Sequence, residues 1–171
     1  ESTTKAYIFY HLSKLNLSLT LLGGNSTNDA GDSVASGDIN NDTVKDIIIG
    51  GSSSFKLPPV GESPGAVYLI YGRNYTDKKR INLSLATPNV TIRGANGSDI
   101  TGSSVASGDV NNDKAQDIII GASSVDFDLN EGAVYVIYGS KKYAANKVFD
   151  LNNVSANINI AAIIQVSFLF I

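Results

Sequence analysis

Two short segments of the chain place oxygen-bearing side chains at the same positions. The first runs from Asp38 to Asp46 and the second, 71 residues later, from Asp109 to Asp117. Hard divalent cations prefer several oxygen ligands at about 2.3–2.6 Å, and a tight loop can direct alternate side chains and one backbone carbonyl at a single point. The pattern indicates a Ca²⁺ loop. The candidate ligands, at positions 1, 3, 5, 7 (through the carbonyl) and 9, are Asp38, Asn40, Asp42, Val44 and Asp46 in the first loop and Asp109, Asn111, Asp113, Ala115 and Asp117 in the second.

The three carboxylates of each loop would repel one another without a cation. Two like charges about 4 Å apart repel by roughly 4 kcal/mol at an effective dielectric constant of 20, and a bound divalent ion turns that repulsion into attraction. The alternative structural interpretation is a solvated Asp-Asn turn, which such residues form without any ion. The recurrence of Asp at positions 1, 5 and 9 in both copies favours the metal.

The residues that follow each loop exclude an EF-hand. That motif has a bidentate Glu at position 12 and a helix on either side, whereas position 12 is Ile49 in one copy and Ile120 in the other. In both copies the last Asp is followed by three consecutive Ile residues and a Gly. Such β-branched runs predict buried strands, so we expect each loop to lie between two strands.

The loops belong to an internal duplication. Residues 31–50 and 102–121 are identical at 15 of 20 aligned positions, and Gly65–Gly72 returns as Gly132–Gly139 with one substitution. A repeat of this length with about four short strands is typical of a propeller blade. In the second repeat we predict strands near Ser103–Ser107, Ile118–Gly121, Ala133–Tyr138 and Ile158–Ile160.

The ends of the chain are out of register with whole blades. Tyr7–Tyr10 is similar to the third strand of an earlier unit, and the apolar segment after Ile160 is too short to span a bilayer, which takes about 20 residues. A truncated terminus and an anchor both stay open for that segment. We expect the end of a preceding blade at 1–30, a first repeat at 31–94, a second repeat at 95–160, and an apolar tail or truncated next repeat at 161–171.

Composition favours a globular chain without a nucleic-acid partner. Hydrophobic residues make up 43% and charged residues 17%, and the net charge is −3 without a basic stripe. The short basic cluster Lys78–Arg80 is expected to be a solvated loop. The single histidine, His11, has no Ser or carboxylate at a distinctive spacing, so we interpret it as a surface residue. Core or inter-blade packing, rather than a sugar-binding platform, is predicted for Tyr68, Tyr71, Tyr135 and Tyr138.

Two features of the sequence bear on the compartment of the protein. The chain has no Cys, so disulfides give no information, and the absence of an initiating Met fits the removal of a signal peptide. Sequons for N-glycosylation favour secretion, although the chain is rich in Asn, Ser and Thr, and a glycan would not fit inside a metal loop at Asn41. They lie at Asn16, Asn25, Asn41, Asn74, Asn82, Asn89, Asn96 and Asn153.

The repeated motif resembles a known family. Gly-x-Ser-Val-Ala-x-Gly-Asp-x-Asn-x-Asp-x-x-x-Asp-Ile-Ile-Ile-Gly followed by Gly-Ala-Val-Tyr-x-Ile-Tyr-Gly is similar to the FG-GAP repeats of the integrin alpha-chain β-propeller, over about Leu15 to Ile160. The resemblance implies an all-β fold of four-stranded antiparallel blades, with about two full blades plus partial blades in a fragment of a larger propeller. It also implies that the Asp-rich loop joins the first and second strands of a blade and that its five candidate ligands hold Ca²⁺.

The sequence departs from the family pattern in three places. The naming Phe-Gly is Ala30-Gly31 in the first repeat and Thr101-Gly102 in the second, and the naming Gly-Ala-Pro is Gly50-Gly51-Ser52 and Gly121-Ala122-Ser123. These two departures leave the expected fold unchanged, whereas the third concerns the Ca²⁺ loop. Loop position 6, usually Gly in the family, is Thr43 or Lys114. If position 6 takes a positive φ, a residue other than Gly costs roughly 1–2 kcal/mol there, and a β-branched residue costs more.

The function implied by the resemblance is a noncatalytic, calcium-binding extracellular or cell-surface module, glycosylated and used in cell adhesion. Its expected partners are a protein or glycan ligand and further blades in a longer parent chain, with membrane attachment only through a region outside this sequence. The alternative is a propeller appended to a secreted hydrolase or lipase-type enzyme whose catalytic domain lies outside this chain. Fold alone does not decide between these two.

Overall fold

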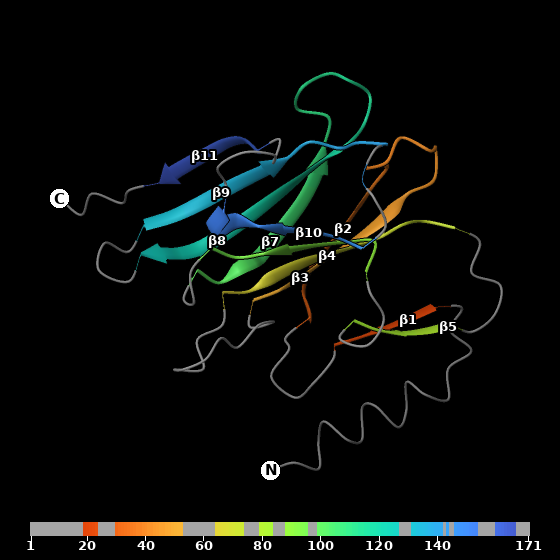
Figure 1. Cartoon of the computed structure of the whole chain (residues 1–171), viewed down its shortest axis with the longest axis horizontal. Helices are drawn as coiled ribbons and strands as arrows, with labels where there is room; N and C mark the ends of the chain where they lie inside the picture. Colours follow the sequence, from red (N-terminus) through yellow and green to blue (C-terminus); the bar gives the residue numbers. More distant parts are fainter. Residues whose placement is uncertain are drawn as a thin grey trace, which may run out of the picture.

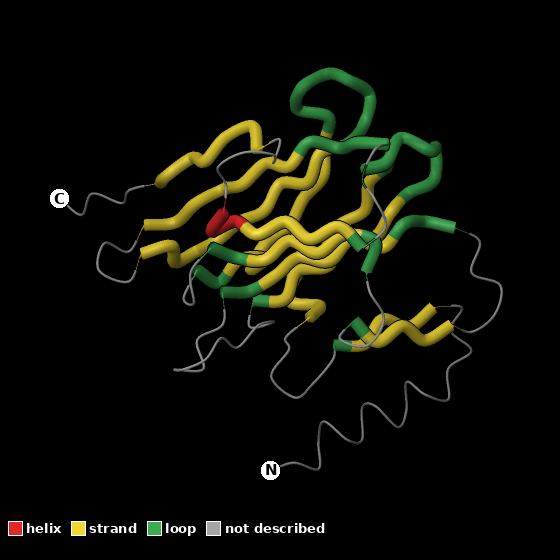
Figure 2. The backbone as a smooth tube through the Cα atoms, viewed as in Figure 1, coloured by secondary structure: helices red, strands yellow, loops and turns green. Residues whose placement is uncertain are grey.

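The computed structural model describes residues 19–23, 30–52, 64–73, 79–83, 88–95, 99–126, 131–141, 143, 146–153 and 160–166. Figure 2 shows that this described part is built from strands and loops with one short helical turn. No helix in these ranges is long and apolar enough to cross a membrane. The elements are β1 (Leu19–Leu22), β2 (Ala30–Gly37), β3 (Asp46–Gly51), β4 (Ala66–Ile70), β5 (Lys79–Asn82), β6 (Val90–Arg93), β7 (Thr101–Gly108), β8 (Asp117–Asp126), β9 (Glu131–Ile137), β10 (Lys147–Asp150), the 3-10 turn η1 (Leu151–Asn153) and β11 (Ile160–Val166).

Four strands of each repeat form an antiparallel set in chain order, whereas the short strands β5 and β10 pair elsewhere (Figure 1). In the first repeat the order is β2, β3, β4 and β6, and in the second it is β7, β8, β9 and β11. Every adjacent pair within these two sets is antiparallel. The predicted fold class, all-β with four-stranded propeller blades, is therefore confirmed.

The fourth strand of the second repeat lies further along the chain than predicted. The sequence predicts it near Ile158–Ile160, whereas β11 extends to Val166 and places Ile163 opposite Tyr135 of β9. This is the place of β6 in the first repeat. A register shift after Ile160 allows the pairing with β9 to continue into the apolar segment. Residues 161–166, expected as part of a tail or a truncated repeat, thus complete the second blade. The predicted strand at Tyr7–Tyr10 and His11 lie outside the described residues.

Two parallel pairings link each repeat to the unit before it. β5, which follows the third strand of the first repeat, pairs with β1, so that Leu19 lies opposite Lys79. β10, its counterpart in the second repeat, pairs with β6, so that Val90 lies opposite Lys147. The segment after each third strand therefore reaches back to the outer strand of the preceding unit. The prediction of a solvated loop is wrong for Lys79 and Arg80, which lie in β5, although the Arg80 side chain is exposed.

The first blade is buried on both faces. Because alternate side chains of a strand point to opposite faces, Ile48 and Leu69 contribute to a core shared with the second blade. Ile49 and Tyr68 instead pack on the other side with Ile81 of β5. Figure 1 shows the same order in space, with the first blade between the second blade and the β1–β5 pair. All five residues of β4 are buried, as the apolar third strand predicts.

The repeated tyrosines take part in this packing. Tyr68 and Tyr135 are each 3% exposed and belong to the two core clusters. Tyr71 is partly buried against the core that the two blades share. The prediction that these side chains pack in the interior, instead of forming an exposed platform, is confirmed for these three residues.

The inner strands of the two blades, β2 and β7, are joined by side-chain hydrogen bonds to the backbone. Ser33 Oγ donates to the carbonyl of Gly102 at 2.8 Å, and Ser107 Oγ donates to the carbonyl of Ser36 at 2.9 Å. A Cβ added to Gly50 would overlap the Gly102 carbonyl. Gly31 and Gly102, the residues kept from the Phe-Gly pair of the family pattern, have φ of +108° and +88° at a register shift in each blade. That conformation favours Gly.

Candidate metal-binding loops

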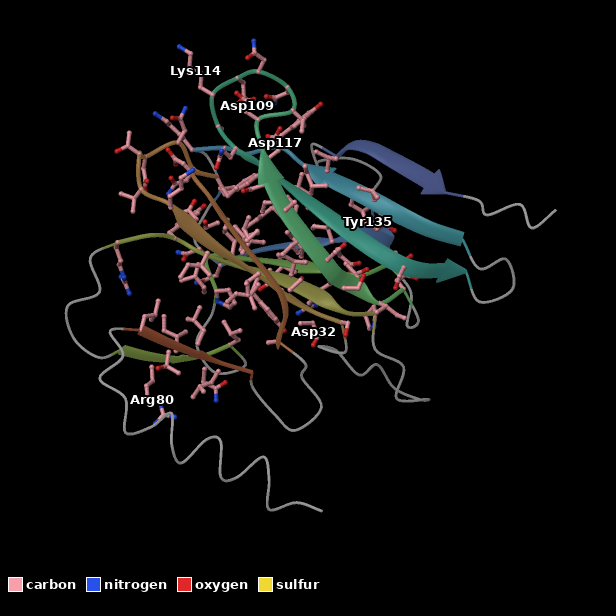
Figure 3. All side chains as sticks on the ribbon, turned by 180° about the vertical axis from the view of Figure 1, so that it is seen from behind. Asp32, Arg80, Asp109, Lys114, Asp117 and Tyr135 are labelled. Atoms are coloured by element: carbon pink, nitrogen blue, oxygen red, sulfur yellow. The ribbon has the colours of Figure 1, made fainter. Side chains whose placement is uncertain are left out.

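The two Asp-rich loops occupy equivalent places in neighbouring blades. The first connects β2 to β3, and the second connects β7 to β8. Figure 3 shows Asp109 and Lys114 on the second loop, with Asp117 at its junction with β8. Both loops thus join the first and second strands of a blade, as the resemblance implies.

In the first loop, the side chains at positions 1, 3 and 5 are held around one turn of backbone. Asp38 Oδ1 and Asn40 Oδ1 both accept the N–H of Asp42, at 2.9 and 3.0 Å. Asp38 Oδ2 accepts the N–H of Thr43 at 2.8 Å, and Asp42 Oδ1 accepts the N–H of Val44 at 2.8 Å. Asn40 Nδ2 also donates to Asp42 Oδ2 at 2.8 Å. The Asn40 and Asp42 side chains therefore contact each other directly, and the Asp38 side chain is held to the same turn through backbone N–H groups.

The second loop repeats this network. The N–H of Asp113 is accepted by Asp109 Oδ1 and Asn111 Oδ1, both at 3.0 Å. Asp109 Oδ2 accepts from Lys114 at 2.9 Å, Asp113 Oδ1 accepts from Ala115 at 2.9 Å, and Asn111 Nδ2 donates to Asp113 Oδ2 at 2.9 Å. Corresponding distances in the two loops agree within 0.1 Å, so differences at positions 2, 6, 7 and 8 leave the turn unchanged.

Asp46, at position 9 of the first loop, is fully buried. Its Oδ2 accepts the N–H of Ile39 at 2.9 Å, and its Oδ1 accepts the N–H of Gly72 at 2.8 Å. Burial raises the pKa of the Asp46 carboxyl above its ordinary value, and the backbone donors oppose that shift. Asp46 therefore connects the start of its loop to the end of the third strand.

Asp117 makes the corresponding contacts in the second loop. It is also fully buried, and it accepts the N–H of Val110 and the N–H of Gly139, both at 2.9 Å. Gly72 and Gly139, the final residues of the repeated Gly-Ala-Val-Tyr segment, thus support the two loops. The sequence shows that both glycines recur at the same place in the repeat. It does not show that they contact the aspartates, because that contact depends on how the strands pair.

Position 6 adopts the left-handed backbone conformation in both loops. Thr43 has φ of +75° and Lys114 has φ of +77°. Position 4 does the same, with φ of +53° at Asn41 and +61° at Asn112. Asn tolerates this region well, whereas Thr and Lys do not, at a cost of roughly 1–2 kcal/mol. Position 6 therefore takes the positive φ at which we expected a residue other than Gly to be strained, and it does so in both loops.

The predicted ligands are only partly brought together. The side chains at positions 3 and 5 are in contact and position 1 binds the backbone N–H of position 5, while the buried position 9 aspartate is attached through the N–H of position 2. Among the residues that the structure describes, no group of three or more His, Cys, Asp or Glu side chains is placed so as to hold a metal ion as it stands. The carboxylates face backbone N–H donors instead, which is the geometry of the solvated-turn alternative.

Gln116, at position 8 of the second loop, joins the two loops to each other. Its Oε1 accepts the N–H of Asp38 at 3.1 Å and is 3.2 Å from Lys45 Nζ. Its own N–H donates to the Asp38 carbonyl at 2.9 Å, and the N–H of Ser140 donates to the Ile39 carbonyl at 2.9 Å. Sequence reasoning missed Gln116 because position 8 differs between the repeats, and nothing local indicates that it reaches a neighbouring loop.

Comparison with known families agrees with this geometry. The family profile described as FG-GAP repeat matches residues 101–137, which span β7, the second loop, β8 and β9. No curated protein matched the chain in a sequence search. Residues 101–137 thus match an FG-GAP repeat, the kind of blade that builds β-propeller modules of integrin-alpha type, and the described part of the chain is built of strands. The first repeat, outside the matched range, has the same strands and the same loop.

Proposed function

We propose that the chain is part of a noncatalytic extracellular β-propeller module that binds Ca²⁺ through its Asp-rich loops and serves cell adhesion by binding a protein or glycan ligand. The observation that carries the proposal is the gathering of side chains at positions 1, 3 and 5 around one turn in both loops, above a buried aspartate. Adhesion, the extracellular location and the ligand class rest on the resemblance to integrin-type repeats.

The chemistry of the donor set fits a hard divalent cation. Each loop offers the oxygens of three carboxylates and one amide, and a carboxylate has about four lone-pair positions, of which the backbone N–H groups use only part. The residues that would hold the ion are the five candidate ligands of each loop, from Asp38 to Asp46 and from Asp109 to Asp117. A bound ion would neutralise their mutual repulsion.

Ca²⁺ suits this donor set better than Mg²⁺. Ca²⁺ accepts six to eight oxygen ligands in a flexible geometry, whereas Mg²⁺ demands a nearly ideal octahedron and gives up its waters reluctantly. A turn closed by Asp and Asn side chains can adjust to the first ion by small rotations of those side chains. The strain at Thr43 and Lys114 works against tight binding, so we expect the affinity of an extracellular module, about 10⁻⁴–10⁻³ M.

The shifted titratable groups support a noncatalytic interpretation. Burial is the main cause that raises the pKa of Asp46, Tyr71 and Tyr135. Asp46 is engaged by two backbone donors, and Tyr71 and Tyr135 pack against the shared core. Packing therefore accounts for these groups without a reaction.

Titration calorimetry of the chain with Ca²⁺ tests the proposal. We expect saturable heat at millimolar Ca²⁺ for the wild-type chain and its loss in the double variant Asp38→Asn, Asp109→Asn, which keeps side-chain shape but removes one charge from each loop. Circular dichroism would establish that both proteins are folded. Absence of binding heat from folded wild-type protein would refute the calcium assignment.

A further inference from the structure

Among the described residues, the two loops differ in their contacts with a neighbouring blade. Gln116 extends from the second loop to the first, where its side chain and its backbone both bond to Asp38. Lys45, which occupies the same position 8 in the first loop, directs its ammonium toward Gln116. Position 8 of one repeat thus contacts position 1 of the repeat before it.

We infer that Gln116 is a positioning residue for the first loop, so that cation binding there depends on the neighbouring blade. The part of this inference that concerns cation binding rests on the proposed function, whereas the part that concerns the structure of the first loop does not. Asp38 is held from across the blade interface by its N–H and by its carbonyl, through two hydrogen bonds with Gln116. The next residue, Ile39, is held in the same way through its carbonyl by the N–H of Ser140.

The hydrogen bonds continue from Asp38 into the turn. Its carboxylate accepts the N–H groups of Asp42 and Thr43, so the direction of this side chain determines how the turn closes. Fixing the Asp38 backbone restricts where the carboxylate can point. A proposed ligand whose backbone is already ordered loses less freedom when an ion binds, and preorganisation of this kind increases affinity.

A carbonyl oxygen at this place satisfies two donors at once. Gln116 Oε1 accepts from a backbone N–H and from the Lys45 ammonium. Gln116→Glu keeps an acceptor of the same reach, whereas Gln116→Leu keeps the volume and removes the acceptor. Comparison of these two variants therefore distinguishes the effect of losing the hydrogen bonds from the effect of changing the packing.

Gln116 also belongs to the second loop, between Ala115 and Asp117. Its N–H is engaged with Asp38, while the flanking residues carry the carbonyl and carboxylate proposed as ligands of the second ion. Gln116 thus links the backbone of the first loop to the segment that carries two proposed ligands of the second. By linkage, any effect of the second site on the first must be reciprocal.

The test compares wild type, Gln116→Leu, Gln116→Glu and the control Ser123→Ala, an exposed change on β8. Hydrogen–deuterium exchange is measured without Ca²⁺, and Tb³⁺ binding is followed by luminescence. In Gln116→Leu we expect exchange of the Asp42 and Thr43 amides to accelerate about three- to tenfold, the range given by the loss of one hydrogen bond. The Asp113 and Lys114 amides should change much less, and Tb³⁺ affinity of the first loop should fall by a similar factor.

Gln116→Glu should restore protection of the first loop, and Ser123→Ala should match wild type. Equal acceleration in both loops, or none in either, would overturn the inference. If wild-type protein binds neither Tb³⁺ nor Ca²⁺, the proposed function fails, while amide exchange still decides the role of Gln116.

To isolate the first site, Tb³⁺ binding is measured in the Asp113→Asn background. If Gln116→Leu leaves the Tb³⁺ affinity of the first loop unchanged there, the dependence of cation binding on Gln116 is contradicted.

Discussion

Ile39 and Val110 occupy the same position in the two loops, yet Ile39 is 0% exposed and Val110 is 53% exposed. Ile39 belongs to the core that both blades share, and its carbonyl accepts the N–H of Ser140 from the second blade. Val110 has no such blade over it among the described residues. Position 2 of the first loop is thus covered by the second repeat.

The first prediction follows from this difference in burial. Ile39→Ala should lower the free energy of unfolding by about 2–5 kcal/mol, as expected for truncation of a fully buried Ile. Val110→Ala should change it by no more than about 0.5 kcal/mol. Urea unfolding without Ca²⁺ measures both. Similar losses in the two variants would mean that the blade interface described here does not form in solution.

The second prediction concerns position 6. Thr43→Gly relieves a β-branched residue at φ +75°, and Lys114→Gly relieves a straight-chain residue at φ +77°. Since a β-branched side chain is less tolerant of this region, Thr43→Gly should strengthen Ca²⁺ binding at its loop more than Lys114→Gly does at the other. Calorimetric titration of each variant provides the comparison. The reverse order would contradict the larger cost assigned to the β-branched residue, and no gain in either variant would show that strain at position 6 does not limit affinity.

The third prediction concerns alkaline pH. Burial raises the pKa of Tyr143 to about 12, and its hydroxyl donates to the Tyr138 carbonyl. The ordinary pKa of a Tyr is about 10, so between about pH 10 and 12 the unfolded chain releases this proton while the folded chain retains it. Stability should therefore fall as pH rises through that window.

Tyr143→Phe should reduce this pH dependence, although it also removes the hydrogen bond and lowers stability at neutral pH. Urea midpoints measured from pH 9 to 12 follow both effects. An unchanged slope in the Phe variant would show that Tyr143 does not cause the alkaline loss.

The fourth prediction concerns the outer surfaces of the two blades. Val34 on β2 is 68% exposed, whereas its repeat counterpart Val105 packs against the shared core. Val110 is exposed at the other end of the blade pair. Because blades bury apolar faces against neighbours, we expect the 171-residue chain to associate, and Val34→Lys with Val110→Lys to reduce association. Light scattering tests this, and a monodisperse wild-type monomer would contradict it.

The local parts of this structure were predictable from the sequence. Three Ile residues after each loop indicate β3 and β8, and the Asp-rich segment before them indicates a loop between two strands, in which the Ca²⁺ site stays a prediction. The family match to residues 101–137 agrees with that interpretation. Both features depend on residues close together in the sequence, where side-chain chemistry and strand alternation decide the structure.

The long-range parts were not predictable. The pairing of β5 with β1 and of β10 with β6 joins four-residue segments with no distinctive pattern, and it depends on how the blades pack. The position of β11 depends on its register with β9, and the role of Gln116 depends on the approach of two loops that lie 71 residues apart. One chain alone contains no local signal for such contacts.

Anomalous diffraction from crystals grown with Tb³⁺ or Ca²⁺ determines whether both loops bind a cation. We expect one anomalous peak in each loop, with the oxygens of Asp38, Asn40, Asp42 and Asp46 and the Val44 carbonyl around the first. The second peak should be surrounded by the corresponding atoms of Asp109, Asn111, Asp113, Ala115 and Asp117. Ordered loops without a peak at millimolar ion, or ions bound only elsewhere, would refute the proposed cation sites.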